Sequence, residues 1–191
     1  MTLSDATILV RRKASSSLVK LGSSMPDIFI PILDNIAPAI LDLSKSDRIM
    51  KTESRLLMEF LVVVISGSRL DVEAKKRYLA VVLEDDFKSL DMYSTALSNS
   101  DAFYQIMVPF PLSSWIQSLG DLTVSVKAQF EQLFRWRQNF INILLSFRHW
   151  IRKSVEISKK NQVDCEGLWS PYIPKLLSIT LLWIKYFECI E

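Results

Sequence analysis

The sequence is short of glycine, the residue that tight β-hairpin turns and bulges use most. Only four glycines occur among the 191 residues. Apolar residues make up 49% of the chain, with Leu, Ile, Val, Phe and Trp abundant, so the chain can bury a sizeable core. This composition argues against both a disordered chain and a β-rich fold with many hairpins. It favours helices.

Histidine is nearly absent, which limits acid-base and nucleophilic catalysis. His149 is the single histidine, so any Ser-His-Asp or Cys-His arrangement has to include it. It stands in the segment SFRHWIRK among basic neighbours, and on a helical wheel it falls near Asn142, Ser146 and Lys153. That position predicts a solvated polar face. We therefore expect no catalytic residue and no enzymatic activity.

The residues that usually hold metals or phosphates are also sparse. Cys165 and Cys189 form no CxxC pair, and the glycines are too far apart to make a phosphate-binding loop. The acidic run Glu84, Asp85 and Asp86 lacks the glycine-centred loop of a calcium site. We expect neither a metal nor a cofactor, and two free thiols in a reducing intracellular compartment.

No uninterrupted apolar run is long enough to cross a bilayer, which takes about 20 residues. The run at 56–65 contains Glu59, and the run at 176–184 contains Ser178 and Thr180. The N-terminal residues lack the pattern of a secretory signal. We expect a soluble protein without membrane insertion. A Trp-containing last helix lying on a membrane surface is an alternative.

Apolar residues recur at helical spacing through most of the chain. The sequence predicts Ser4 as an N-cap and Gly22 as the end of the first helix. Proline at the start of a helix and inside it predicts a kinked second helix. The predicted helices are 5–21, 26–43 with kinks at Pro31 and Pro38, 51–66, a segment capped by Asp71, 87–97, 101–107, 122–155, and a last one that opens at Ser170-Pro171; Pro109 and Pro111 mark a break.

Helices of this length, joined by glycine or short polar turns, suggest a series of antiparallel hairpins. Such a series is typical of an α-solenoid, in which each unit buries its apolar face against its neighbours. The predicted fold is therefore all-α, an α-α superhelix of the HEAT or armadillo type. A compact helical bundle is the alternative, because no fixed repeat length can be read from the sequence.

Several segments resemble one known family of helical-repeat proteins. RRKASSSLVKLGSSMPDIFIPILDNIAPAILDL (11–43) and ESRLLMEFLVVVIS (53–66) resemble repeats of the importin-β-like nuclear transport receptors, with Phe60 in place of the usual alanine. Leu97-Ser98 and Asp101-Ala102-Phe103, together with RWRQNFINILLSFRHWIRKSVEI (135–157) and KLLSITLLWIKYFECI (175–190), are most similar to the exportin-five-type karyopherins.

The resemblance implies that residues 1–191 form a single HEAT-repeat segment of a longer nuclear export receptor. It further implies nucleocytoplasmic transport with Ran-GTP, with nucleoporins and with a cargo of structured RNA, such as tRNA or pre-microRNA, or protein, and a location in nucleus and cytoplasm. The N-terminal Ran-binding repeats of that superfamily have no counterpart in this sequence. A helical-repeat scaffold for protein assembly with no transport role is the alternative.

One local concentration of charge stands out from a chain whose net charge is only +2. Seven basic residues lie between positions 135 and 160, opposed by Glu156 alone. Arg137, Arg148 and Arg152 fall within about 60° of one another on a helix, and Lys153 follows Arg152 in the chain. Guanidinium groups bind both phosphates and carboxylates, so these four residues are candidate contacts for RNA or for an acidic partner.

The same arginines have a second interpretation, in which they border the buried stripe and pair with acidic residues of a neighbouring helix. Both interpretations apply equally to Arg11, Arg12 and Lys13. The aromatic residues of this region are predicted to pack between helices rather than to stack on bases; they are Trp136, Phe140, Phe147 and Trp150.

Overall fold

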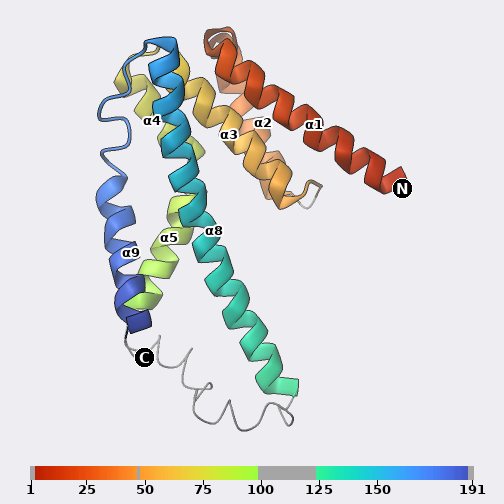
Figure 1. Ribbon diagram of the computed structural model, residues 1–191, viewed down its shortest axis with the longest axis vertical. Coiled ribbons are helices and arrows are strands. Elements are labelled where there is room, and N and C mark those ends of the chain that lie inside the picture. The colour runs from red at the N-terminus through yellow and green to blue at the C-terminus, as the bar shows by residue number, and fades with distance from the viewer. Residues whose placement is uncertain (1–2, 47, 99–123, 189–191) are drawn as a thin grey trace. The chain divides into compact units, whose positions relative to one another are not determined.

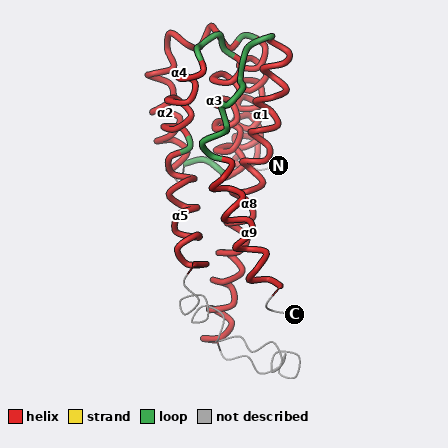
Figure 2. Tube along the Cα trace, turned by 90° about the vertical axis from the view of Figure 1, so that its left-hand side faces the viewer, coloured by secondary structure: helices red, strands yellow, loops and turns green. Residues whose placement is uncertain are grey.

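The chain is all-α in the residues that its computed structural model describes, which are 3–46, 48–98 and 124–188. Every described segment is helix or loop, with no strand among them (Figure 2). The helices are α1 (Leu3–Ser24), the 3-10 helix η1 (Pro26–Ile32), α2 (Leu33–Lys45), α3 (Lys51–Gly67), α4 (Val72–Val82), α5 (Glu84–Ser98), α8 (Val124–Asn161) and α9 (Ile173–Glu188). The predicted fold class is confirmed.

The helices divide into two compact units. The first unit comprises Met1–Glu84 and Ser146–Pro171, and the second comprises Asp85–Leu145 and Tyr172–Glu191. The long helix α8 contributes residues to both units.

In the first unit, the helices α1, α3 and α8 run in the same direction, with α3 in the middle. Arg11 of α1 pairs with Glu53 near the start of α3, while Gly22 near the end of α1 meets Phe60 further along α3. On the other side of α3, contacts between α3 and α8 progress in the same order, from Glu59 with His149 to Gly67 with Asn161. Figure 1 shows α1 and α3 in this parallel arrangement. Along the chain, η1 and α2 connect the end of α1 to the start of α3. Helices repeated in one direction and linked by returning helices are what stacked hairpins produce.

Helix α3 is the centre of the first unit's core. Its residues from Phe60 to Gly67 are all buried, because α1 covers one side and α8 the other. Phe60 also receives the ring of Phe29 from η1 edge to face, with 5.0 Å between centroids. A helix that is apolar around most of its circumference is stable only when neighbours surround it in this way.

The helix boundaries follow local chemistry that the sequence displays. The carboxylate of Asp71 accepts a hydrogen bond from the backbone N–H of Ala74 at 2.8 Å, which confirms it as the N-cap of α4. Pro26 opens η1. The predicted kinked helix 26–43 is a 3-10 turn that passes into α2 at Leu33.

Several predicted boundaries are wrong. The largest difference is at the end of α8, which continues six residues beyond the predicted Val155 to Asn161. Helix α1 begins at Leu3, so Ser4 lies inside it, and it continues through Gly22 to Ser24. The hydroxyl of Ser170 donates to the carbonyl oxygen of Gly167 in a turn, and α9 starts only at Ile173. The predicted segment 101–107 and the break at Pro109 and Pro111 lie outside the described residues, as does Cys189.

The second unit is built around an aromatic cluster. Phe140 of α8 is fully buried and stacks on Trp183 of α9, with 4.2 Å between ring centroids. Trp136 stacks on the same indole at 5.6 Å, and Tyr93 of α5 contacts both Trp136 and Phe140. The prediction that Trp136 and Phe140 pack between helices is confirmed.

Within the described residues, no single helix combines the length and the apolar character needed to cross a membrane. Ala6–Ser24 and Pro26–Lys45 meet that criterion only when taken together, and they are bent by 104° at the break between them.

Candidate partner-binding surface

The part of α8 in the first unit, Ser146–Asn161, has one face turned toward α3. Phe147 and Trp150 are buried on it and pack edge to face, with 5.5 Å between ring centroids. Ile157 continues the apolar contact one turn before the helix ends and lies against Gly67. The prediction that Phe147 and Trp150 pack between helices is therefore confirmed as well.

Polar contacts on the same face fix the rotation of α8 against α3. The hydroxyls of Ser154 and Ser66 share a hydrogen bond of 2.7 Å inside the core. The hydroxyl of Ser158 donates to the carbonyl oxygen of Ser66 at 3.0 Å. The side-chain amide of Asn161 donates to the carbonyl oxygen of Gly67 at 3.1 Å. The last carbonyls of a helix have no partner within it, so α8 satisfies those of α3. A rotation of α8 would leave these buried groups unpaired.

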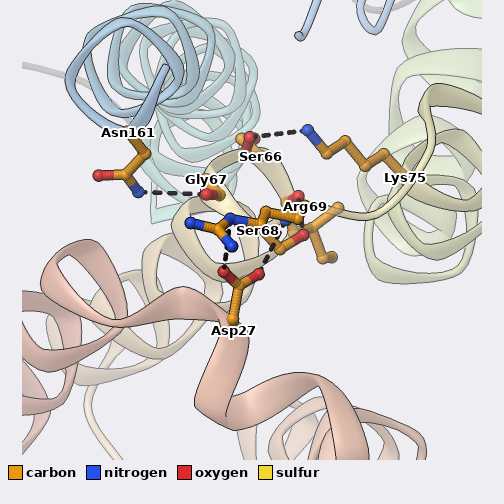
Figure 3. A network of polar contacts seen from close by, with 8 residues as sticks. Asp27, Ser66, Gly67, Ser68, Arg69, Lys75 and Asn161 are labelled. Atoms are coloured by element: carbon orange, nitrogen blue, oxygen red, sulfur yellow. Dashed lines mark hydrogen bonds and ion pairs between the residues drawn. The ribbon is translucent and has the colours of Figure 1, made fainter. Parts of the chain in front are cut away.

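A buried lysine completes the network at the end of α3. Lys75 of α4 is 1% exposed, and its ammonium donates to the carbonyl oxygens of Ser66 at 3.2 Å and Asp164 at 2.7 Å. Figure 3 shows Lys75 and Asn161 reaching this helix end from opposite sides. A cation at a helix C-terminus is favourable for the helix dipole, but burial still costs the charged form its hydration and lowers the pKa of Lys75.

The lowered pKa of Lys75 predicts a pH-dependent stability. Between this pKa and the ordinary value of 10.5, the unfolded chain binds more protons than the folded one, so stability rises with pH. We expect wild type to gain stability relative to Lys75→Met as the pH is raised toward 10.5, by about 1.4 kcal/mol for each unit by which the pKa is lowered.

Urea unfolding of both proteins at a series of pH values measures this effect. Lys76→Met, on the same helix and paired with Glu73 near the surface, is the control. A stability difference between wild type and Lys75→Met that does not change with pH would contradict the prediction.

Beside this network lies a shallow hollow of about 330 Å³. Its rim includes Asp27 and Arg69, whose backbone N–H and guanidinium contact the Asp27 carboxylate at 2.8 and 3.7 Å (Figure 3). Met25, Pro26 and Val163 line the rest of the hollow together with Asn161 and others. The ion pair ties η1 to the connection after α3, which makes it a link between helices.

His149 does not lie on a fully solvated face as predicted. Its Nε2 is 3.1 Å from the carboxylate of Glu59 on α3, and Glu59 is largely buried, with 14% of its side chain exposed. No local pattern in the sequence shows that an acidic residue of α3 faces His149. The pair joins the two helices.

The opposite face of α8 carries an exposed row of side chains, which we call the outer ridge. It consists of Arg148, Arg152, Val155 and Lys159, spaced four, three and four residues apart, so they lie within about 60° on the helix. The side chain of Arg152 is 66% exposed and the residue Val155 is 38% exposed. The bonds between α8 and α3 keep this row turned outward.

Glu156 contacts two of the predicted contact residues, Arg152 and Lys153. The ammonium of Lys153 donates to its carboxylate at 2.9 Å, and Nε of Arg152 lies at 3.5 Å. The hydrogen bond from Lys153 lowers the pKa of Glu156, and the charge of Arg152 acts in the same direction. The carboxylate therefore stays ionised and offsets part of the positive charge.

Of the four predicted contact residues, Arg148, Arg152 and Lys153 lie in the first unit, where Arg152 and Lys153 both contact Glu156. Arg137 is exposed in the second unit. Sequence reasoning missed Val155 and Lys159 on the outer ridge. Val155 and Lys159 follow Arg148 by seven and eleven residues, and this spacing predicts that they share its side of a helix. Arg11, by contrast, follows the second interpretation, since Nε lies 3.3 Å from Glu53 of α3, whose side chain is 2% exposed.

Comparison with known proteins is informative at the level of the family. The family model for the Exportin-5 family matches residues 2–179 of the chain. No curated protein and no solved structure matches it. The matched range includes the first unit's row of helices, the outer ridge and most of the aromatic cluster.

Proposed function

Because this chain belongs to the Exportin-5 family of nuclear transport receptors, we propose that it binds cargo together with Ran-GTP during export from the nucleus. The family match over residues 2–179 is the observation that carries this proposal. Members of the family are transport receptors rather than enzymes and shuttle between nucleus and cytoplasm, so we place this chain in both compartments.

Within such a receptor, we assign residues 1–191 to one HEAT-repeat segment of a longer polypeptide. The parallel helices α1, α3 and α8 of the first unit support this assignment, because stacking of this kind extends naturally to further hairpins. Nucleoporins and Ran-GTP would then be engaged by the whole receptor, with this segment supplying part of its surface.

The cargo classes that fit are structured RNA, such as tRNA or pre-microRNA, and protein. Arg148, Arg152 and Lys153 support cargo binding in the first unit, because guanidinium and ammonium groups on an exposed helix face attract either phosphates or carboxylates. Arg137 offers the same chemistry in the second unit.

Ran-GTP dependence is the measurement that tests transport. We expect the full-length receptor to bind a labelled RNA hairpin or a protein cargo at least tenfold more tightly with Ran-GTP than with Ran-GDP, which corresponds to a coupling of about 1.4 kcal/mol or more. Equal cargo affinity with both forms of Ran would remove the transport assignment and favour the alternative, a helical-repeat scaffold for protein assembly.

A further inference from the structure

The outer ridge of α8 combines charge and apolar surface in a fixed order. Three cations, Arg148, Arg152 and Lys159, flank the half-exposed isopropyl group of Val155. The row is about 16 Å long, and its intervals of four and three residues are those at which a second helix packs its own side chains. A surface of this length and spacing fits three turns of a partner helix.

We propose that the outer ridge of α8 binds an acidic amphipathic helix of a protein partner. The carboxylates of that helix pair with Arg148, Arg152 and Lys159, and one aliphatic side chain packs on Val155. This inference rests on the proposed function, because it names the class of cargo or cofactor protein that the basic residues of the first unit recognise.

Two observations favour a protein helix over the backbone of RNA. Val155 sits in the middle of the row, where a phosphate backbone has no apolar group to cover it. Glu156 stands among the cations as a carboxylate, 3.5 Å from Arg152 and 2.9 Å from Lys153, and it repels any phosphate that binds next to it. A helix can place its few carboxylates away from Glu156, whereas a nucleic acid carries its charge continuously.

The arginine side chains are suited to such pairing. The Arg152 guanidinium is only loosely engaged by Glu156, and its side chain is 66% exposed, so its remaining N–H groups are available to a second carboxylate.

Binding of synthetic peptides to the 191-residue chain tests the proposal. The probes are alanine-based helical peptides with three glutamates and one leucine on a single face at the spacing of the ridge, prepared in both chain directions. A peptide of the same composition with these residues scattered around the helix is the control. A short RNA duplex is the competing ligand.

We expect one of the ordered peptides to bind more tightly than the scattered one. Arg148→Gln with Arg152→Gln should weaken this binding about tenfold, and Val155→Ala should weaken it about threefold. Val155→Ala should leave any affinity for the RNA duplex unchanged. Arg12→Gln, an exposed cation on α1, should leave peptide binding unchanged.

Three outcomes would overturn the proposal. The first is equal binding of the ordered and the scattered peptides, which would indicate unspecific charge attraction. The second is peptide binding that Val155→Ala does not change. The third is binding of the RNA duplex without binding of either ordered peptide. None of these outcomes depends on Ran-GTP, so the transport function is tested separately, by comparing cargo affinity with Ran-GTP and with Ran-GDP.

Discussion

Phe140→Ala is expected to lower the free energy of unfolding of the second unit by about 3–5 kcal/mol. The ring is fully buried, stacks on Trp183 at 4.2 Å and meets Tyr93 edge-on at 5.1 Å. Removing it leaves a cavity between α5, α8 and α9 and breaks aromatic contacts that contribute about 0.5–1.5 kcal/mol per pair beyond the area they bury.

Phe134→Ala is the matched control for this substitution. It lies on the same helix in the same unit, but the residue is 54% exposed, so we expect a loss below about 1 kcal/mol. Urea unfolding followed by circular dichroism measures both variants, and the near-ultraviolet signal of the tryptophans should weaken only for Phe140→Ala. Similar losses for the two variants would show that the cluster does not stabilise the second unit.

The helices themselves were largely predictable from the sequence. Apolar spacing, the Asp71 cap and the proline positions reported the existence and type of the helices, because these signals act within one or two turns. The first helix was misjudged at both ends, and at its C-terminal end the reason is a contact with α3. Leu3 and Ser4 are already helical, and a glycine such as Gly22 is compatible with a helix interior when another helix needs the space.

The candidate surface was predictable only in part. Helical spacing placed Arg148 and Arg152 on one flank, since that follows from the geometry of a single helix. The partner of His149, the buried position of Lys75 and the outward direction of the ridge all depend on how α3 lies against α4 and α8. Contacts between residues that are some 90 positions apart, such as Ser66 with Ser154, leave no periodic trace in one sequence.

Gly67→Ala should destabilise the first unit by about 1–3 kcal/mol, although alanine normally favours a helix more than glycine does. A Cβ at this position would lie 2.4 Å from the Cγ2 of Ile157 and 3.0 Å from the Asn161 amide nitrogen. The Ile157 methyl is attached to a branched, buried carbon and cannot turn aside, so α8 has to move away from α3. The movement would stretch the hydrogen bond from Asn161 to the Gly67 carbonyl and loosen the contact between Ser154 and Ser66.

A double-mutant cycle separates this steric effect from a change in helix propensity. Ile157→Ala removes the obstructing methyl, so Gly67→Ala should cost less in its presence than in wild type, with a coupling of about 0.5–3 kcal/mol. The measurement is the urea midpoint of the two single variants and the double variant. If the two substitutions are additive, the close approach of α3 and α8 is not what requires glycine at position 67.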